Sequence, residues 1–324
     1  MTVLALNIGS SSVKYALFEG EEELERGSTT EDPTALLKLK PEAVGHRLVH
    51  GGERYIQPTL LTPRVIEELQ TLIPFAPLHL PRELGLVKAI QGVPQVGCFD
   101  TAFHANMPEE ARHYPLPKTL WERGVKRYGF HGLSYTYIAG QLGPSIPDRT
   151  VVAHLGNGSS LAALYKGQCV DTTMGFTPTG GVVMGTRSGD LDPGILLYCL
   201  RELGMDEPAL ADMVDHKSGL LGIAGTSDMR ELLERRRAQP DAALAVHLFV
   251  NSVAKGVATL TTALGGLDLL VFTGGIGEHS EVIRNQIVDR LPFLHFTTEV
   301  IPTDEERVIA RSTYQVLHGT RSLT

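Results

Sequence analysis

Two segments of the chain share one pattern, in which an apolar strand leads into a turn of glycine and serine and then into a second strand. The first runs over residues 4–20 and the second over residues 151–167, and with one gap Gly9–Ser12 aligns with Gly158–Ser160. Glycine lets a backbone approach a phosphate without a Cβ clash, so both turns are typical of nucleotide-binding sites. Two ordinary β-hairpins would give the same local pattern. The repetition favours two related domains around one nucleotide cleft.

Composition narrows the class of protein. The 324 residues suffice for two domains, and the formal net charge is −8 with one short basic run at residues 235–237, so we expect no nucleic-acid partner. No apolar run approaches the ~18 residues that span a bilayer, so we expect no membrane partner. The three cysteines, Cys98, Cys169 and Cys199, are scattered. This usage is typical of a reducing compartment and predicts a cytoplasmic protein without disulfides or a zinc cluster.

Strands alternate with helices along the chain, which predicts an α/β architecture. We expect two strands over residues 1–20, a charged hairpin tip over residues 21–30 that leads into a third strand, and further strands over residues 43–49, 93–99, 150–167 (two) and 267–273. We expect helices over residues 62–73, 134–142, 242–264, 278–291 and 304–316. Pro63 suits the first position of its helix, and Thr303 with Glu306 reads as a capping box. Residues 175–194 are glycine-rich yet charged, which is typical of a functional loop.

Polar residues gather where the expected strands end, at residues 7–14, 100, 156–160 and 273–278. Ligands of α/β sheets bind beyond these strand ends. Four residues add charge: Arg47 in an apolar strand, Asp100 at a strand end, His131 between glycines and Arg187 on a glycine-bounded loop. Each alone is also typical of a structural residue. Together, two guanidinium groups, an imidazole and a carboxylate suit an anionic acceptor and a charged transition state.

The ordered motifs of the chain resemble those of the acetate kinase family, the acetate, propionate and butyrate kinases of the actin-like ATPase superfamily. The matching segments are NIGSSSVKYALF, GHRLVHGGE, APLH, FDTAFH, RYGFHGLS, HLGNGSS, MGFTPTGG, MGTRSGDLDPG, SGLLGI, SDMR, VFTGGIGEHS and IPTDEE. The resemblance implies two actin-like ATPase (ribonuclease H-like) domains with a duplicated βββαβαβα core and a nucleotide cleft between them. The N-terminal domain would comprise residues 1–101 and 306–324, and the C-terminal domain residues 102–305.

The resemblance also implies the chemistry: ATP and acetate give ADP and acetyl phosphate by direct in-line transfer, reversibly and with Mg²⁺. Arg47 and Arg187 would meet between the domains and hold the carboxylate and the moving phosphoryl group. His131 would contact the equatorial oxygens, and Asp100 would orient the acceptor or the water shell of the metal. The other implied residues are Val49, Leu78, His79, Phe130 and Pro178 for the acyl group, Ser10, Ser12, Lys14, Asn157 and Gly158 for the phosphates, Asp228, Met229, Arg230, Gly275 and Ile276 for the adenosine, and Asn7 and Glu305 for the metal.

The family implies Mg²⁺ or Mn²⁺ as cofactor, ATP as co-substrate, a short-chain carboxylate as acceptor and a homodimer formed through the C-terminal domain. The chain is shorter than is usual for the family, mainly over residues 18–46 and 291–301, and it carries Tyr135, Thr179, Gly180 and His279 at positions where the family usually differs. Two readings stay open beside acetate kinase: a propionate or butyrate kinase, and a weakly active nucleotide-binding scaffold. A sugar kinase is disfavoured, since it would need a carboxylate base and polar sugar contacts.

Overall fold

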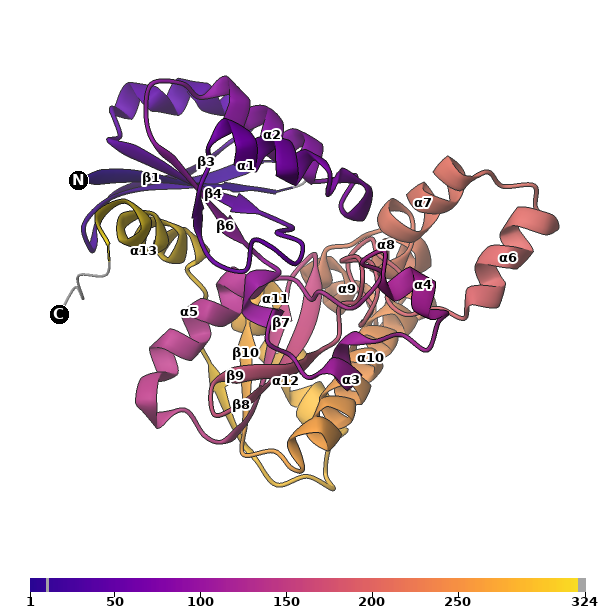
Figure 1. Cartoon of the computed structure of the whole chain (residues 1–324). Coiled ribbons are helices and arrows are strands. Elements are labelled where there is room, and N and C mark those ends of the chain that lie inside the picture. The colour runs from indigo at the N-terminus through magenta and orange to yellow at the C-terminus, as the bar shows by residue number, and fades with distance from the viewer. Residues whose placement is uncertain (10–11, 320–324) are drawn as a thin grey trace. The chain divides into compact units, whose positions relative to one another are not determined.

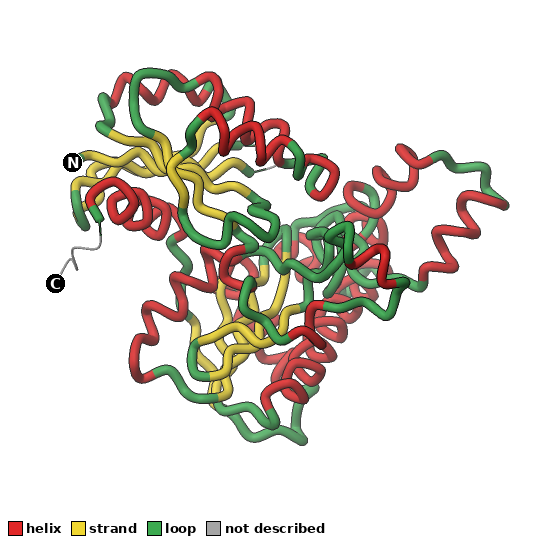
Figure 2. Tube along the Cα trace, in the orientation of Figure 1, coloured by secondary structure: helices red, strands yellow, loops and turns green. Residues whose placement is uncertain are grey.

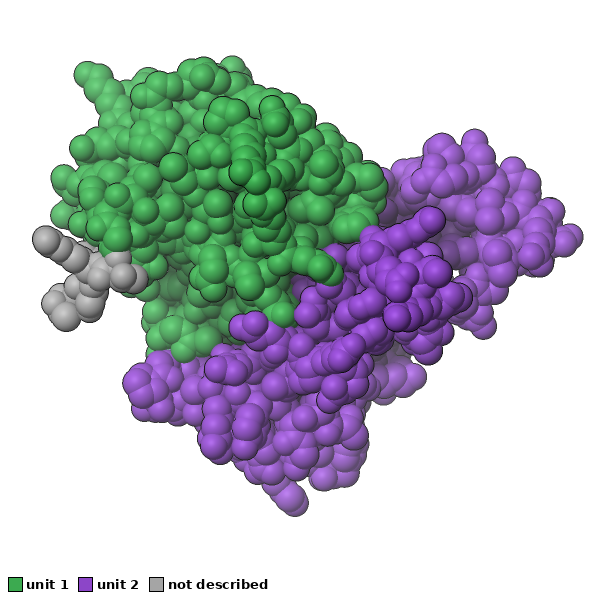
Figure 3. Space-filling model, in the orientation of Figure 1, with its two compact units in different colours: residues 1–105, 130–141, 304–324 green, residues 106–129, 142–303 purple. Residues whose placement is uncertain are grey.

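The computed structural model describes residues 1–9 and 12–319, and the chain divides into two compact units (Figure 3). Unit 1 comprises residues 1–105, 130–141 and the chain from residue 304, and unit 2 comprises residues 106–129 and 142–303. Each unit contains a sheet and helices, which confirms the predicted α/β class (Figure 2). The domain boundaries taken from the resemblance stay a prediction.

Unit 1 is built on a six-stranded mixed sheet with the order β3-β2-β1-β4-β6-β5. Figure 1 labels β1, β3, β4 and β6 of this sheet. β1 pairs antiparallel with β2 and parallel with β4, and β4 is parallel to β6. The strands are β1 (Thr2–Ile8), β2 (Val13–Glu19), β3 (Glu22–Thr29), β4 (Ala43–Leu48), β5 (Thr59–Leu60) and β6 (Gln95–Phe99). The predicted strands of this region are thereby confirmed within a few residues.

Both faces of the unit 1 sheet are covered by helices. Alternate side chains of β1 point to opposite faces of the sheet, so this strand packs on both sides. Val3 and Ala5 pack with residues of α13 (Glu305–His318) in one hydrophobic cluster. Leu4 and Leu6 pack on the other face with residues of α2 (Leu80–Ala89). A run of fully buried residues in β1 follows from this two-sided burial.

The other helices of unit 1 are short. Thr62 caps α1 as predicted, with its hydroxyl accepting from the Val65 amide and Pro63 in the first helical position. The sequence did not predict α2, which begins at Leu80 just after two prolines and a histidine. The remaining elements are the 3₁₀ turns η1 (Pro33–Leu39), η2 (Ile73–Phe75) and η3 (Ala102–His104), and the helices α1 (Pro63–Gln70) and α5 (Gly132–Leu142).

Unit 2 repeats the strand order of unit 1. Its sheet runs β11-β10-β7-β8-β9, with the same parallel and antiparallel pairings as β6-β4-β1-β2-β3. Even a register shift recurs at one position, between Leu17 and Phe18 of β2 and between Ala163 and Leu164 of β8. The strands are β7 (Arg149–Leu155), β8 (Ser159–Tyr165), β9 (Gln168–Thr172), β10 (Leu269–Thr273) and β11 (Thr297–Val300). The duplicated core predicted from the sequence is confirmed.

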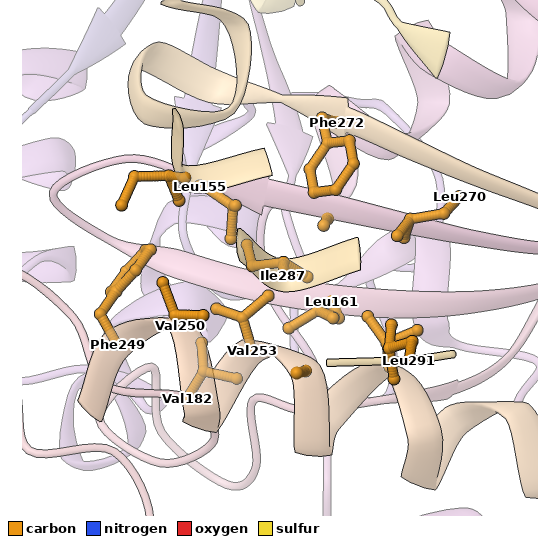
Figure 4. Packing of buried hydrophobic residues seen from close by; sticks show 14 of the residues in the cluster. Leu155, Leu161, Val182, Phe249, Val250, Val253, Leu270, Phe272, Ile287 and Leu291 are labelled. Atoms are coloured by element: carbon orange, nitrogen blue, oxygen red, sulfur yellow. The ribbon is translucent and has the colours of Figure 1, made fainter. Parts of the chain in front are cut away.

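The core of unit 2 forms between this sheet and a long helix, α10 (Pro240–Leu264). Phe249, Val250 and Val253 of α10 pack beneath Leu161 of β8 (Figure 4). By length and composition α10 could cross a membrane, but most of its apolar side chains belong to this core. The other helical elements are α3 (Glu109–Arg112), α4 (Lys118–Trp121), η4 (Gly143–Ser145), α6 (Pro193–Arg201), α7 (Glu207–His216), α8 (Gly219–Ala224), α9 (Met229–Arg235), α11 (Gly274–His279) and α12 (Glu281–Val288).

Three local expectations were wrong. Residues 278–291 form no single helix, because α11 starts directly after β10 and the chain leaves helical geometry at Ser280 before α12. Thr303 does not cap α13; the Asp304 carboxylate accepts from the Arg307 amide instead, since Glu306 is held by other partners. Finally, Ser159 and Ser160 are buried residues of β8, so the turn equivalent to Gly9–Ser12 is residues 156–158.

Candidate active site

Three polar residues lie at the carboxyl ends of neighbouring strands in unit 1. Asn7 is the last but one residue of β1, Arg47 is the last but one residue of β4, and Asp100 directly follows β6. Since β1, β4 and β6 are parallel neighbours, these residues share one edge of the sheet. The structure thus brings together the first arginine, the carboxylate and one metal-site residue predicted from the sequence.

Arg47 and Asp100 form a buried ion pair. Nε and Nη2 of Arg47 donate to Oδ2 of Asp100 at 2.9 and 2.6 Å, and Nη1 donates to the Ile8 carbonyl oxygen at 3.2 Å. Asp100 is fully buried, and its Oδ1 has no hydrogen-bond partner within the described residues. Burial opposes the charge of Arg47, but the charges of Asp100 and Glu305 outweigh it and raise the pKa of Arg47. The guanidinium is therefore held rigid and charged.

Asn7 joins this pair to the start of α13. Its Nδ2 donates to Oε2 of Glu305 at 2.8 Å and to Oε1 of Glu306 at 2.9 Å, and its Oδ1 faces Nη1 of Arg47 at 3.5 Å. Burial raises the pKa of the Glu305 carboxyl to about 7, although the charge of Arg47 acts in the opposite direction. The two residues predicted for the metal, Asn7 and Glu305, are in direct contact.

His131 lies beside Asp100. Its φ of 59° falls in the left-handed region, which is uncommon for a residue other than glycine and is found at functional sites. A Cβ on Gly132 would overlap the carbonyl oxygen of Asp100, so only glycine allows this close approach. The ring of Phe130 lies 5.9 Å from that of His50, the residue after Val49. The loop of residues 130–132 thus meets the ends of β4 and β6.

The predicted acyl-group residues of unit 1 differ in exposure. Val49 and Phe130 are buried, His79 is half-buried at the start of α2, and Leu78 is 49% exposed. The Val49 amide donates to Oε2 of Glu83 at 2.9 Å. Burial raises the pKa of the Glu83 carboxyl to about 7, and its Oε1 has no hydrogen-bond partner within the part of the chain described.

The first glycine-serine turn carries the residues predicted for the phosphates. Ser10 lies outside the described residues. The Gly9 amide donates to the carbonyl oxygen of Ser12 at 2.8 Å, which closes the turn. Lys14 is exposed on β2 and is the register partner of Asn7, so both side chains leave the same face of the sheet.

In unit 2, two loops meet at the equivalent sheet edge. The Gly185 amide donates to the carbonyl oxygen of Asn157 at 2.9 Å, and a Cβ on Gly185 would overlap the Asn157 side chain. Nη1 of Arg187 donates to the carbonyl oxygen of Pro178 at 3.4 Å. The turn that contains Asn157 and Gly158 therefore lies against the loop that carries Arg187. Since Arg47 and Arg187 belong to different units, their convergence stays a prediction.

The residues predicted for the adenosine lie on two helix starts of unit 2. Gly275 and Ile276 are in the first turn of α11, and a Cβ on Gly156 would lie 4.0 Å from the Gly275 amide nitrogen. Asp228, Met229 and Arg230 open α9, where Asp228 caps the helix. Its hydrogen bonds with the Arg230 side chain lower the pKa of the Asp228 carboxyl to about 2. Asp228 thus has an evident structural role.

The residues described in each unit lie on a fold that is shared with known kinases. The sequence model of the Acetokinase family matches residues 28–316, which is most of the chain. The chain belongs to the acetokinase family. It is 39% identical to a protein named acetate kinase from Rhodopseudomonas palustris, over 98% of this chain and 99% of that protein. The alignment spans 396 positions, so this acetokinase chain of 324 residues is the shorter of the two within the aligned region.

Solved structures agree with this membership. A propionate kinase from Francisella tularensis superposes with a TM-score of 0.91 at 33% identity, over 97% of this chain and 99% of that one. The acetate kinase of Porphyromonas gingivalis superposes with a TM-score of 0.86 at 34% identity, over 98% of this chain and 99% of that one. The family resemblance predicted from the motifs is confirmed. These neighbours act on different carboxylates, so the family alone leaves the acyl group open.

The residues of unit 1 fit a magnesium ion. Asn7 and Glu305 offer hard oxygen ligands, and Oδ1 of Asp100 is a buried carboxylate oxygen without a protein partner. Within residues 1–9 and 12–319, no group of three or more histidine, cysteine, aspartate or glutamate side chains could enclose a metal. Mg²⁺ is commonly bound by one or two carboxylates together with water and substrate phosphates, so this sparse set suits it.

Sequence reasoning missed four residues of this acetokinase that contact or face the site. Glu83 and Glu306 are buried carboxylates, Arg26 pairs with Glu306, and the strand register places His154 of β7 where Asn7 stands in β1. His154 lies inside the HLGNGSS motif, and this position was a usable signal. No sequence pattern indicated Arg26, because 280 residues separate it from its partner Glu306.

Proposed function

We propose that the protein is an acetate kinase that transfers the γ-phosphoryl group of Mg-ATP to acetate, reversibly and by direct in-line displacement. One observation carries the proposal: a buried, charged Arg47, held by Asp100 at the end of three parallel strands, in a chain that aligns with acetate kinases from end to end. A guanidinium matches a carboxylate or phosphoryl group and stays charged, whereas a binding module needs no such group.

The residues of unit 1 would act mainly by position and charge. Asp100 occupies the Nε–Nη2 edge of Arg47 and the Ile8 carbonyl oxygen accepts from Nη1, which together fix the plane of the guanidinium for the substrate oxygens. A general base is hardly needed, because an acetate carboxylate with a pKa of about 4–5 is already ionised at neutral pH. Arg187 of unit 2 would add a second positive charge on the phosphoryl group in transit, with His131 donating to its equatorial oxygens.

Asn7 and Glu305 would hold Mg²⁺, directly or through water, with Asp100 orienting that water shell. Bound Mg²⁺ would neutralise charge on the β- and γ-phosphates, as it does in phosphotransferases generally, and Mn²⁺ could replace it. Ser10, Ser12, Lys14, Asn157 and Gly158 would line the phosphates. The adenosine would lie against Asp228, Met229, Arg230, Gly275 and Ile276.

The acyl group would pack on the apolar residues near Arg47. Val49 and Phe130 are buried beside the strand ends, whereas Leu78 is half exposed; with His79 and Pro178 they form the proposed acyl site. One methylene changes discrimination in such a pocket by only about 1–3 kcal/mol. A propionate kinase is therefore the second candidate, favoured by the structural neighbour of that name.

The decisive test is an assay of purified protein that traps acyl phosphate as the hydroxamate. We expect product that requires acetate, ATP and Mg²⁺ together, and kcat/KM highest for acetate among acetate, propionate and butyrate. A higher kcat/KM for propionate would make the protein a propionate kinase. ATP binding without any acyl phosphate would instead support a nucleotide-binding scaffold. Replacing ATP with GTP or pyrophosphate in the same assay identifies the phosphoryl donor.

We further propose that the active protein is a cytoplasmic homodimer formed through unit 2. Helix α6 supports this, because Cys199 is its one buried residue, while Ile195, Leu197, Tyr198 and Leu200 are 44–56% exposed. Figure 1 shows α6 and α7 extending away from the sheet of unit 2. Contiguous exposed apolar side chains mark association surfaces. Light scattering should give twice the 35.2 kDa chain mass, and Leu197→Asp should give monomer. A monomeric wild type would contradict this.

A further inference from the structure

A single arginine of the β2–β3 hairpin contacts the residues on either side of Glu305, one of the two residues proposed for the metal. Arg26 lies on the edge strand β3, and its side chain is 38% exposed. Its Nη1 donates to Oε2 of Glu306 at 2.8 Å, and its Nη2 donates to Oδ1 of Asp304 at 2.7 Å. Nε and Nη2 also contact the Glu23 carboxylate on the same strand. The guanidinium therefore fixes the two acidic residues on either side of Glu305.

Glu306 contacts both Arg26 and Asn7, so a fixed Glu306 also fixes Asn7. Its Oε2 is taken by Arg26 and its Oε1 accepts from Nδ2 of Asn7 at 2.9 Å, so both carboxylate oxygens have one defined partner. A side-chain amide has two N–H groups, and Asn7 directs the other to Glu305. With both donors used, Oδ1 of Asn7 must point the other way, toward Arg47. The amide orientation of Asn7 thus depends on Glu306 staying in place.

The charges around Asn7 also indicate that its orientation depends on Glu306 and Arg26. Glu305 and Glu306 are adjacent in sequence, Glu306 is buried and Glu305 half-buried, and both accept from the same neutral amide. Without a cation beside Glu306, two like charges would compete for Asn7 and repel each other. Arg26 supplies that cation at hydrogen-bond distance. Arg47 lies on the other side of Asn7, with its guanidinium committed to Asp100.

We propose that Arg26 is a positioning residue for the magnesium site of unit 1: through Glu306 it fixes the amide of Asn7, which turns Oδ1 away from the two glutamates and holds the carboxylate of Glu305 in place for the metal. The inference rests on the proposed function. It assigns a role to the hairpin, which lies outside the sheet edge where the other predicted residues gather. Residues that orient metal ligands through hydrogen bonds typically contribute about 10–100-fold to metal affinity.

The test compares Arg26→Gln with Arg311→Gln. Arg311 also joins α13 to the hairpin, by an ion pair with Glu21, but it contacts neither Glu306 nor Asn7. Binding of Mn²⁺ in the presence of ADP is measured by electron paramagnetic resonance, which needs no turnover, and KM for Mg²⁺ is measured separately from kcat. We expect Arg26→Gln to weaken Mn²⁺ binding and raise KM for Mg²⁺ by about tenfold or more. Arg311→Gln should change neither by more than about twofold.

Two further variants make the result specific. Glu306→Gln keeps an acceptor for Asn7 without the charge, so Arg26→Gln should add little in that background, and the double-mutant cycle should show strong coupling. Arg26→Lys should fall between wild type and Arg26→Gln, because lysine keeps the charge but not the fork. Thermal unfolding checks that each variant is folded. Unchanged Mn²⁺ affinity in Arg26→Gln, an equal loss in Arg311→Gln, or no Mn²⁺ binding by wild type would overturn the inference. A wild type that binds Mn²⁺ and ADP but forms no acetyl phosphate would refute only the proposed function.

Discussion

Replacing Arg47 with alanine is expected to lower kcat for acetyl phosphate formation by on the order of 10³–10⁵, the range attributed to positioned arginines in phosphoryl transfer. Arg47 is a largely buried cation of unit 1, and two hydrogen bonds to Asp100 orient it. Alanine removes the charge that would be matched to the transition state, so kcat should fall more than substrate affinity. Steady-state kinetics with saturating Mg-ATP and varied acetate give kcat and the KM for acetate.

The controls separate a catalytic role from a structural one. Arg47→Lys keeps a positive charge but loses the planar fork of N–H donors of the guanidinium, so its kcat should be only a small part of the wild-type value. Arg64 is a matched arginine of unit 1 whose side chain is 77% exposed, and Arg64→Ala should leave kcat within about twofold. ATP binding, followed by calorimetry, should persist in all three variants. Wild-type turnover by Arg47→Ala would show that the assigned role is wrong.

Replacing Asp100 with alanine is expected to destabilise unit 1 by about 3–5 kcal/mol, because it leaves Arg47 buried without its carboxylate partner. Asp100 is fully buried, and the Arg47 side chain is only 15% exposed, so water can replace the lost contact only in part. Asp100→Asn keeps the shape and one acceptor but not the charge, and it should be intermediate. Urea unfolding followed by circular dichroism measures the free energy of unfolding.

Asp268 provides a matched control. It forms an ion pair with Arg149 of the same residue types, but both side chains are 33–40% exposed. Exposed pairs of this kind contribute about 0–1 kcal/mol, so Asp268→Ala should cost far less than Asp100→Ala. Equal losses from the two variants would show that the burial of Arg47 is not what makes its partner important.

The sequence predicted those parts of the fold that local pattern determines. Apolar runs ending in polar residues located β1, β4, β6, β7 and β10, and the Arg47 and Asp100 positions followed from where two of these strands end. The break at Ser280 between α11 and α12 was missed, although serine is a favoured residue at helix N-caps and could have indicated it. Helix α2 was missed since a proline and a histidine precede it.

The rest depends on contacts between distant parts of the chain. Thr303 has a better local capping pattern than Asp304, yet Asp304 caps α13 because Glu306 is drawn to Asn7 and Arg26, 299 and 280 residues away in the sequence. The burial of Glu83 likewise follows from the packing of α2 against β4, which no local motif records. The aligned serines of the two turns misled the comparison, since identity of residues does not fix strand register.

The shared register shift shows that the two sheets match in the pairing of individual residues as well as in strand order. In β3 the unpaired residue is Leu24, between Glu23 and Glu25, and in β9 it is Val170, between Cys169 and Asp171. An extra residue in one strand is a β-bulge, which bends the strand and tends to persist in families. Two bulges at one position point to a common ancestor that already carried the extra residue before its gene was copied and fused. The paired positions of β1, β2 and β3 can therefore be matched one by one with those of β7, β8 and β9, and Leu24 corresponds to Val170.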